Sequence, residues 1–502
     1  MTNWTLANLL AKADITPQTP LPADADVPVT SLSVDSRTVQ AGACFIAIPG
    51  TAVDGHRFID AAVAAGARSI LAEREVELPH GVTAVRVPDA RRAAARMAAA
   101  FFRINDVQNG RRLRLVGITG TNGKSTTAYL IRSILEADGH RTALLGTIRY
   151  DLIDKTVESS LTTPGPVELC SHLAHAMSAG ASYAVLETSS HALAQLRCEG
   201  LSFDVGVFTN LSGDHLDYHQ TVDEYLCAKK RLFDGLGPAA FAAVNGEDGA
   251  SDRIVADCRA GILRYGIEGP ALNIRADIHR SDWRGSVFDI VAEGHALTRV
   301  SLPQLGRHNV MNSLAAAAAA RSLGIRPDGI RRGLEAVTTV EGRLQRVSPA
   351  DCPFAVIVDY AHTDHALQNA LRAVRPLTPG RVLCVFGCGG DRDRTKRPRM
   401  ARAVAQAADV AFVTSDNPRT EDPLAIIHEV LPGFTGPHRC QVEVDPDRAT
   451  AIRKAVEAAR PGDTVLIAGK GHENYQIIGM QRMHFGDAEV AHTCLRRLEV
   501  TS

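Results

Sequence analysis

The stretch Val116-Gly-Ile-Thr-Gly-Thr-Asn-Gly-Lys-Ser-Thr-Thr127 decides the fold of the chain around it. It predicts a buried strand over 113–118, then a glycine-rich turn, then a helix that begins at Lys124. The free amides of a first helical turn carry partial positive charge, which suits a polyphosphate. We interpret the stretch as a phosphate-binding loop, in which Lys124 reaches the phosphates and Ser125 offers a hydroxyl to Mg²⁺. Glycine allows the backbone to approach a ligand closely, and we expect this of Gly117, Gly120 and Gly123.

This loop departs from the general template at one position. The pattern G-x-x-x-x-G-K-[ST] requires a glycine at position 118, whereas Ile118 stands there and the first glycine is Gly117. The alternative interpretation is a plain strand–turn–helix with a lysine on the surface. The Gly-Lys-Ser sequence between a strand and a helix favours a phosphate loop of a variant type.

Length and composition restrict the class of protein. A chain of 502 residues is too long for one core and predicts about three domains. The formal net charge is -1, which gives no electrostatic case for binding nucleic acid or an anionic membrane. Ten cysteines without a CxxC pair, and an N-terminus without the features of a signal peptide, favour reduced thiols in the cytoplasm. The apolar runs are too short to cross a membrane, so we expect no membrane insertion.

Alternation of strand and helix patterns divides the chain into three α/β segments. Residues 1–110 predict a small α/β domain, which ends in an alanine-rich helix capped by Asp89. Residues 111–343 form the segment of the phosphate loop, with shorter antiparallel strands expected over 272–302. Residues 344–502 predict a parallel, Rossmann-like unit. The expected fold class is therefore α/β, with mainly parallel sheets in three domains.

Several strands of the middle segment end in polar residues. Thr147, Glu187 and Asn210 each follow an apolar strand. Ligands of open parallel sheets bind at the carboxyl ends of the strands, so these residues are expected on the same edge as the phosphate loop. Glu187 could hold Mg²⁺ together with Ser125, or it could cap the next helix.

Most of the other candidate residues have two interpretations on the residues alone. The stretch Asp214–His219 could bind a metal or form a polar loop. Lys229 lies on an amphipathic helix, and its spacing favours a solvated charge. Asp359 ends a strand and could contact a ribose or a nucleotide-bound water, or cap a helix. Arg419 could hold a carboxylate, or pair with acidic neighbours at the surface. Glu473 could accept an ammonium group.

Many of these motifs occur together in an order that resembles the Mur ligases. The resemblance extends from Asp35-Ser-Arg37 to Gly469-Lys-Gly-His-Glu473, and Thr119-Gly-Thr-Asn-Gly-Lys-Ser125 is similar to the family's own phosphate loop. It implies an N-terminal domain for a UDP-linked substrate, a central ATP-binding domain and a C-terminal domain for an incoming amino acid. The resemblance is strongest to members that add 2,6-diaminopimelate to UDP-N-acetylmuramoyl-L-alanyl-D-glutamate with ATP and Mg²⁺.

The resemblance also implies roles for individual residues. On the ATP side it implies Gly117, Thr119, Gly120, Thr121, Asn122, Gly123, Lys124, Ser125, Thr126, Asn309, Arg343 and Asp359. For the UDP-linked substrate it implies Val34, Ser36, Thr51, Thr162, Thr163, Ser189, Gln195 and Arg197. Lys229 matches a carbamylated lysine, so that it, Ser125, Glu187 and His215 become expected metal-site members. The catalytic set is then Lys124, Lys229, Glu187 and His215.

The acceptor amino acid is implied by a further set of residues. Asp416-Asn-Pro-Arg419 resembles the family's diaminopimelate signature, and its companions are Arg392, Gly469 and Glu473, with Pro418 inside the motif. Diaminopimelate has a second carboxylate that lysine lacks, and an arginine is suited to select it. The phosphate loop and Arg419 belong to different domains, so closure of the domains is expected.

Some positions differ from the family pattern, and other functions remain open. Ser125 replaces the commoner threonine, Asp364 stands where proline is usual, and Thr162–Pro166 forms an unusual loop. The alternatives are the same ligase with L-lysine as acceptor, a relative of the folylpolyglutamate synthases, or a non-catalytic nucleotide-binding regulator. The expected partners are small-molecule substrates only, and the chain is expected to act as a monomer.

Overall fold

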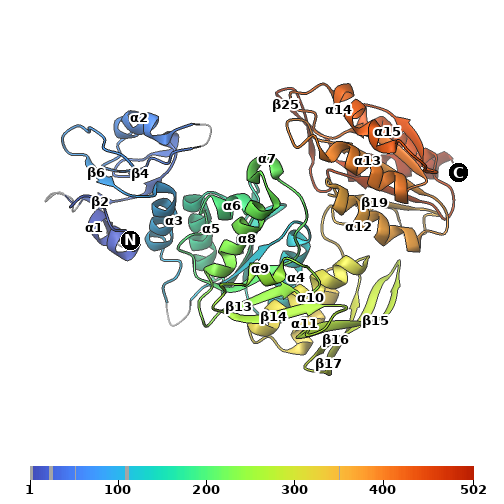
Figure 1. The fold of residues 1–502 in the computed structure, drawn as a ribbon, viewed down its shortest axis with the longest axis horizontal. Coiled ribbons are helices and arrows are strands. Elements are labelled where there is room, and N and C mark those ends of the chain that lie inside the picture. The colour runs from blue at the N-terminus through green and yellow to red at the C-terminus, as the bar shows by residue number, and fades with distance from the viewer. Residues whose placement is uncertain (1–3, 22–26, 51–52, 108–111, 350, 502) are drawn as a thin grey trace.

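The computed structural model describes residues 4–21, 27–50, 53–107, 112–349 and 351–501. Its three units follow one another along the longest axis of the molecule, in the order of the sequence (Figure 1). Each unit is built around a β-sheet of its own, and all three sheets contain parallel strand pairs. The prediction of an α/β fold with three domains is confirmed.

The N-terminal unit contains a parallel four-stranded sheet in the order β3-β4-β5-β6, beside a short antiparallel pair of β1 and β2. Asp89 caps α3 as expected, because its side chain accepts from the backbone amide of Arg92. The elements are β1 (Trp4–Thr5), α1 (Leu6–Lys12), β2 (Pro28–Val29), β3 (Leu32–Ser33), η1 (Ser36–Thr38), β4 (Cys44–Ile46), η2 (Gly55–Phe58), α2 (Ile59–Ala64), β5 (Ser69–Ala72), β6 (Thr83–Arg86) and α3 (Ala90–Phe101).

The central unit has one sheet in the order β10-β9-β8-β11-β7-β12-β13-β14-β15-β16-β17. The elements are β7 (Arg114–Thr119), α4 (Lys124–Ala137), β8 (Thr142–Leu145), β9 (Arg149–Asp151), β10 (Thr156–Glu158), α5 (Pro166–Ser178), β11 (Tyr183–Glu187), α6 (Ser190–Ala194), β12 (Phe203–Phe208), α7 (Leu216–His219), α8 (Val222–Asp234), β13 (Phe241–Asn245), α9 (Ser251–Ile254), β14 (Gly261–Gly266), β15 (Ile274–Asp282), β16 (Gly285–Ala292), β17 (His295–Leu302), α10 (Arg307–Ser322) and α11 (Pro327–Ala336).

Strand β7 lies between β11 and β12 in the parallel part of this sheet, so the phosphate loop leaves the sheet between two neighbouring strand ends. The expectation of antiparallel strands over 272–302 is confirmed, but the expectation that they are shorter is wrong. β15, β16 and β17 have 9, 8 and 8 residues and are antiparallel to one another, but they extend the central sheet through the parallel pair of β14 and β15. Cross-strand pairing beyond the parallel core, which local alternation does not reveal, accounts for the difference.

The third unit contains the sheet β18-β19-β23-β20-β21-β22, parallel except for the β18–β19 pair. A hairpin of β24 and β25 stands apart from this sheet. The elements are β18 (Gln345–Arg346), β19 (Ala355–Asp359), α12 (Asp364–Val374), η3 (Arg375–Leu377), β20 (Val382–Cys388), α13 (Lys396–Ala407), β21 (Val410–Ser415), α14 (Pro423–Val430), η4 (Leu431–Phe434), β22 (Gln441–Val444), α15 (Arg448–Glu457), β23 (Thr464–Ala468), β24 (Tyr475–Ile478), β25 (Gln481–His484) and α16 (Asp487–Thr501).

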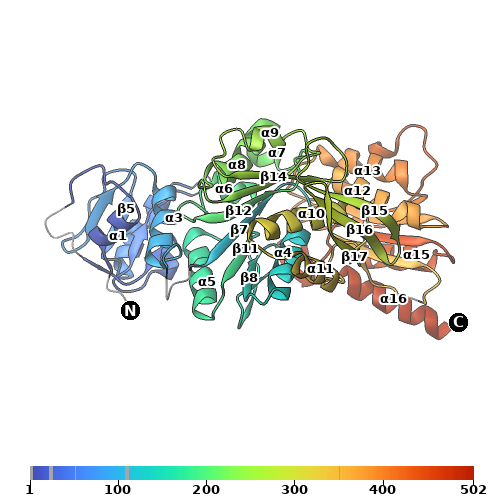
Figure 2. The same cartoon turned by 90° about the horizontal axis from the view of Figure 1, so that it is seen from below.

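Helices cover both faces of the two larger sheets (Figure 2). In the central unit α4 and α10 bury their apolar residues on one face, while α5 and α8 pack on the other. In the third unit α12 and α13 cover one face, and α15 and α16 cover the other. This arrangement leaves the strand ends free to form sites at the sheet edges.

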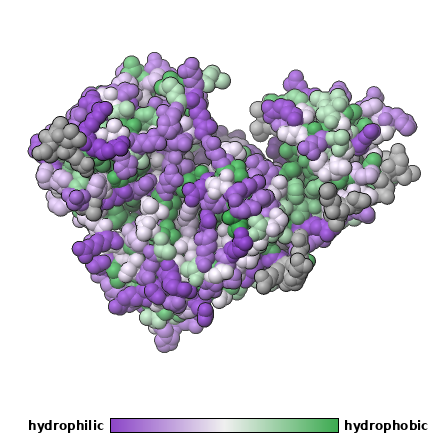
Figure 3. Space-filling model, turned by 180° about the vertical axis from the view of Figure 1, so that it is seen from behind, coloured by the Kyte–Doolittle hydropathy of each residue, from purple (hydrophilic) through white to green (hydrophobic). Residues whose placement is uncertain are grey.

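The surface of the back face mixes hydrophilic residues with scattered hydrophobic ones (Figure 3). A notch in this view separates the N-terminal unit from the rest of the molecule. Among the described residues, no helix has the length and hydropathy needed to span a bilayer. All ten cysteines are free thiols.

Candidate active site

The phosphate loop turns sharply between β7 and α4. Gly120 and Gly123 have φ angles of 147° and 84°, a region that side chains with a Cβ rarely adopt. A Cβ on Gly120 would overlap with the side chain of Thr209, and one on Gly123 would overlap with Asn312. Both positions therefore require glycine. The turn aims the first amides of α4 at the space above the loop, where an anion can bind.

The glycine at position 117 has a different purpose from the one expected. Gly117 lies inside β7, and a Cβ there would come within 2.9 Å of the Phe203 ring and 3.0 Å of Leu232. It therefore makes room for packing under the sheet, and the expectation that it lets the backbone approach a ligand is corrected. Thr119, the last residue of β7, is fully buried as well.

Lys124 is folded back over the loop. Its ammonium donates to the carbonyl oxygens of Gly120 and Thr121 at 3.0 and 2.9 Å. Burial lowers the pKa of Lys124, and the carboxylates of Glu187 and Asp214 oppose that change. Both acceptors are carbonyl oxygens of the loop itself, so the loop backbone holds the ammonium group.

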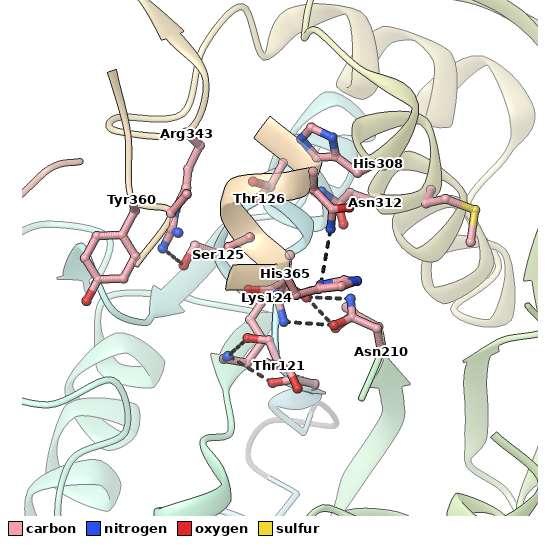
Figure 4. Close-up of a pocket in the computed structure, with 18 of the residues that line it drawn as sticks. Thr121, Lys124, Ser125, Thr126, Asn210, His308, Asn312, Arg343, Tyr360 and His365 are labelled. Carbon is pink, nitrogen blue, oxygen red and sulfur yellow. Dashed lines mark hydrogen bonds between the residues drawn. The ribbon is translucent and has the colours of Figure 1, made fainter. Parts of the chain in front are cut away.

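A cavity of about 700 Å³ opens beside this loop. Residues of the central unit line one side and residues 359–373 of the third unit line the other. Arg343 bridges the two, because its Nη2 donates to Ser125 Oγ at 3.0 Å while its guanidinium stacks 4.5 Å from the Tyr360 ring (Figure 4). A cavity of this size between two domains can hold a nucleotide.

Glu187 ends β11 within hydrogen-bonding distance of the loop. Its Oε2 accepts from the hydroxyls of Ser125 and Thr147 at 3.0 Å each, and its Oε1 accepts from the Thr147 amide at 2.9 Å. The side chain is 1% exposed. A buried carboxylate next to a hydroxyl provides oxygen donors of the kind that Mg²⁺ prefers.

Lys229 is buried, not solvated as its spacing suggested. The residue is 1% exposed, and its ammonium donates to the Gly120 carbonyl at 3.0 Å and lies 4.0 Å from the centre of the Tyr225 ring. Burial and the charge of Lys124 place the pKa of Lys229 well below its ordinary value. Lys229 lies on the buried face of α8 together with Tyr225 and Leu232, so tertiary packing overrides the expectation from its spacing.

His215 lines the same cavity from the turn before α7. Its backbone is left-handed at φ 55°, and its ring lies edge-on to that of His191 with 4.8 Å between centres. Burial lowers the pKa of His215 to about 3, against the opposing charge of Asp214. A neutral imidazole is the form that binds metals. Within the described part of the chain, no three His, Cys, Asp or Glu side chains form a ready metal cluster.

Asp359 and Asn309 have structural partners as well as a place in the cavity wall. The two Asp359 oxygens accept from the backbone amides of Leu344 and Ala361 at 2.7 and 2.8 Å, and burial raises its pKa. Asn309 donates to the Leu305 carbonyl at 2.8 Å. Asp359 thereby fixes the backbone that connects the central unit to the third. It does not cap the following helix, because Thr363 is the N-cap of α12.

The residues expected to bind the UDP-linked substrate fall into two groups. Thr163 is buried and donates to the Glu187 carbonyl, while Arg197 donates to the Thr163 carbonyl at 2.7 Å and to Gln195. Ser189 and Thr162 adjoin this group through hydroxyl contacts with Thr163 and Thr147.

The second group lies in the N-terminal unit. Val34 follows β3 and Ser36 begins η1. Among the described residues, no hydrogen bond joins either one to the group around Thr163. Thr51, which was expected to belong to this group, lies outside the described residues.

The acceptor motif gathers at the carboxyl ends of β21 and β23. Asn417 donates to Glu473 Oε2 at 2.9 Å, and Lys470 donates to both Asn417 and Glu473 at 3.1 Å. A Cβ on Gly469 would come within 2.8 Å of Asp416 Oδ2. Burial and the neighbouring Asp416 raise the pKa of Glu473, and Lys470 opposes them. The structure thus brings together two segments more than 50 residues apart.

Arg419 does not pair with the acidic residues that follow it. Its Nη1 donates to the carbonyls of Gly390 and Asn417 at 2.8 and 3.4 Å, while Glu421 pairs with Arg397. Arg392 is exposed, and both Arg392 and Arg419 lie within 4 Å of where a Cβ on Gly389 would stand. Among the described residues Arg419 forms no ion pair with Glu421 or Asp422, so the surface-pairing alternative is wrong. The Arg419 guanidinium and the Arg392 side chain both lie beside Gly389.

The acceptor residues are not part of the cavity wall beside the phosphate loop. Closure of the domains, which would bring the two sites together, stays a prediction.

Some residues of the site were not found from the sequence. Tyr360 stacks on Arg343, His365 lies 3.3 Å from the Asn122 amide, and Lys470 is fully buried between the acceptor residues. The Gly-Lys-Gly-His-Glu motif indicates a constrained turn at Lys470, because a glycine stands on each side of it, but it does not indicate that the lysine is buried. For His365 the sequence offers no such signal.

The comparisons with known proteins agree with this architecture. Three family models match in succession: "Mur ligase family, catalytic domain" over 28–103, "Mur ligase middle domain" over 118–320 and "Mur ligase, glutamate ligase domain" over 342–471. The chain is 43% identical to a UDP-N-acetylmuramoyl-L-alanyl-D-glutamate--2,6-diaminopimelate ligase of Solibacter usitatus, with 95% of each chain covered. It is 42% identical to the ligase of that name from Geobacter metallireducens, with 94% of each covered.

A solved structure of a ligase with this same name superimposes with a TM-score of 0.69. The two chains are 32% identical, and the comparison covers 99% of this chain and 100% of the other. Coverage of this extent includes all three units. The chain therefore belongs to the Mur ligase family.

Proposed function

We propose that this chain is an ATP-dependent ligase that joins meso-2,6-diaminopimelate to UDP-N-acetylmuramoyl-L-alanyl-D-glutamate in peptidoglycan precursor synthesis. The observation that carries the proposal is the similarity, over nearly the whole length of both chains, to ligases that bear this name. The cavity at the phosphate loop supports a nucleotide substrate. The group of Asn417, Arg419 and Glu473 supports an acceptor with both carboxylates and ammonium groups.

The reaction needs ATP because a carboxylate does not react with an amine to form an amide at neutral pH. The γ-phosphoryl group is transferred to the D-glutamyl γ-carboxylate, which gives ADP and an acyl phosphate. An amine of the acceptor then attacks the acyl carbon, and the tetrahedral intermediate expels inorganic phosphate. The new C–N bond replaces the C–O bond to phosphate, and the amine loses its proton to solvent.

The phosphate loop holds the nucleotide. The amides at the start of α4 bind phosphate oxygens, and Lys124 leaves the Gly120 and Thr121 carbonyls to neutralise charge on the transferring group. Arg343, which donates to Ser125 from the end of the central segment, brings a second positive charge to the same place. The remaining contacts in this proposal are the loop residues and the cavity residues Asn309 and Asp359.

The residues around Glu187 fit a Mg²⁺ ion. Ser125 and Glu187 offer oxygen atoms 3.0 Å apart, and the neutral His215 lines the same cavity. The ion would supply charge neutralisation at the phosphates. Lys229 completes the set after modification: its depressed pKa makes the neutral amine available, and addition of CO₂ gives a carbamate with loss of one proton. A carbamate is an anion, so it would remove the buried positive charge beside Gly120.

The acceptor edge selects the amino acid. Arg419, with Arg392 beside it, binds the second carboxylate of diaminopimelate, while Asp416 and Glu473 receive an ammonium group. An acceptor such as L-lysine would leave that guanidinium without its carboxylate, which disfavours it. The UDP-linked substrate lies between the group around Thr163 and the N-terminal unit. We further propose that the enzyme acts as a monomer in the cytoplasm, with small-molecule partners only.

Phosphate release by the purified protein tests this function. The assay contains ATP, Mg²⁺ and UDP-N-acetylmuramoyl-L-alanyl-D-glutamate, with either meso-diaminopimelate or L-lysine as acceptor. We expect release with diaminopimelate and little with lysine. Release with lysine alone would assign the other acceptor, and no release with any amino acid would support a non-catalytic nucleotide-binding protein.

A further inference from the structure

Lys470 is a buried lysine at the acceptor edge that the proposed chemistry does not use directly. It follows β23 and its side chain is 0% exposed. Its ammonium donates to Asn417 Oδ1 and to Glu473 Oε2, both at 3.1 Å, and lies 5.3 Å from the centre of the Tyr475 ring. Removing an ammonium from water is costly unless partners compensate for it. We therefore expect the buried charge of Lys470 to have a function at the acceptor edge.

The backbone around Lys470 is shaped to turn the side chain inward. Gly469 and Gly471 have φ angles of 121° and 56°. A Cβ on Gly469 would come within 2.8 Å of Asp416 Oδ2, and one on Gly471 within 2.7 Å of Tyr360 Cβ. Positions 469 and 471 both require glycine, and this backbone places the Lys470 side chain in the space between the two acceptor segments.

Glu473 receives its hydrogen bonds on one oxygen only. Oε2 accepts from Lys470 and from Asn417 Nδ2, whereas Oε1 makes no hydrogen bond to any of the residues described. The side chain is 17% exposed. Two donors on one oxygen fix the plane of the carboxylate and leave the other oxygen for a ligand.

The surroundings of Glu473 shift its pKa in opposite directions. Burial and Asp416 raise its pKa, while Lys470 and the amide of Asn417 lower it. Tyr360, Tyr475 and Arg448 also interact electrostatically with this carboxyl group. Arg448 is itself paired with Asp487. Lys470 is therefore the cation that directly contacts Glu473.

We propose that Lys470 is a positioning residue for the acceptor amino acid: it keeps the Glu473 carboxylate ionised and oriented, so that Oε1 accepts an ammonium group of the substrate. The lysine does not touch the substrate and acts through Glu473 and Asn417. The inference rests on the proposed function, since it assumes that an amino acid binds at this edge. It adds that the affinity for this amino acid depends on pH through Lys470.

The substitution Lys470→Met removes the charge and keeps a similar length. Without the cation the pKa of Glu473 rises, so ionised Glu473 is lost at a higher pH. We expect the acidic limb of kcat/KM for diaminopimelate to move up by about 1 pH unit, and KM to rise about tenfold, with KM for ATP within about threefold of wild type. An acidic limb within about 0.3 pH unit of wild type would overturn the proposal.

Two further variants separate charge from packing. In a Glu473→Gln background no carboxylate remains to be ionised, so adding Lys470→Met should shift no pH limb and should change KM less than about threefold. If Lys470→Met alone does not fold, the double variant should fold, because it leaves no unpaired buried carboxylate. Failure of the double variant to fold would make Lys470 a packing residue and refute the proposal. Lys454→Met, which removes a partly exposed pair with Asp445 in the same unit, is the matched control.

The outcomes for this inference and for the proposed function are distinguishable. Wild-type turnover with diaminopimelate tests the function, whereas the position of the acidic limb in Lys470→Met tests the lysine. Should the wild type use another amino acid instead, the same comparison is made with that amino acid, because every acceptor has an ammonium group. An unshifted limb there would reject the inference on its own.

Discussion

The phosphate loop and the acceptor edge occupy equivalent places on two sheets, yet they are built differently. Both lie at the carboxyl ends of parallel strands. The loop is one continuous segment, shaped by Gly120 and Gly123. The acceptor edge gathers three separate segments, around Arg392, Arg419 and Lys470, and hydrogen bonds of Asn417 with Lys470 and Glu473 join two of them. The site that supplies energy is thus local in sequence, and the site that selects the substrate is assembled by the fold.

The largest expected effect concerns the local site. Lys124→Ala removes the cation that faces the transferring phosphoryl group, so kcat for phosphate release should fall about 10³-fold. Binding of the acceptor, measured by calorimetry, should change little because Lys124 does not line the acceptor edge. Lys230→Ala is the control, since this lysine of α8 pairs with Asp234 and Asp257 away from the loop. A loss of kcat below tenfold for Lys124→Ala would show that Lys124 does not neutralise charge on the transferring phosphoryl group.

The next effect concerns the assembled site. Arg419→Leu removes a guanidinium expected to hold the second carboxylate, so kcat/KM for diaminopimelate should fall about 10- to 100-fold. The weak activity with L-lysine should stay the same, and the preference between the two acceptors should therefore shrink. Arg402→Leu, at an exposed position on α13, is the matched control. Equal losses of kcat/KM with both acceptors would show that Arg419 supports the structure of its loop and does not select between the two amino acids.

How far the sequence predicts each site follows from this difference. Strand, turn and helix around the loop were predictable because glycines and Lys124 stand next to one another. Glu187 and Asn417 were also predictable, since each ends or follows an apolar strand. The burial of Lys229 and Lys470 was not, because a lysine in a helix or loop is usually solvated, and only tertiary packing places it inside.

Two structural features also lay beyond local patterns. The β24–β25 hairpin and the extension of the central sheet by β15 to β17 depend on pairing partners elsewhere in the chain. The role of Gly117 was misjudged for a related reason. Its neighbours Phe203 and Leu232 lie more than 80 positions away in sequence, so the glycine motif gave no indication of them.

A smaller effect should distinguish the structural role of Gly117 from the ligand-binding role of Gly123. Gly117→Ala introduces a Cβ 2.9 Å from Phe203 without changing the residues that line the cavity, so it should lower the free energy of unfolding by about 1–3 kcal/mol. The affinity for ADP should be retained. Gly123→Ala, at a left-handed position, should instead weaken ADP binding. Denaturant unfolding and a nucleotide titration measure the two. Loss of ADP affinity in Gly117→Ala would return this residue to the ligand site.

The smallest expected effect concerns the link between the two edges. Arg482 of β25 pairs with Glu158 of β10 at 2.9 Å, across the central and third units, and β24 in the same hairpin accepts the Arg419 amide at the Ile477 carbonyl. Both partners are more than half exposed. An exposed pair contributes at most about 1 kcal/mol, so Arg482→Ala should leave KM for diaminopimelate within about threefold of wild type.

A double-mutant cycle with Glu158→Ala measures this link directly. We expect a coupling free energy below about 1 kcal/mol that disappears in high salt. A larger coupling, expressed in KM for both ATP and diaminopimelate, would contradict this expectation. The hairpin would then act as a rigid connection that transmits the position of Arg419 to the central sheet. In that case the phosphate loop and the acceptor edge would move together, because the same hairpin would hold the acceptor loop and set its distance from the phosphate loop.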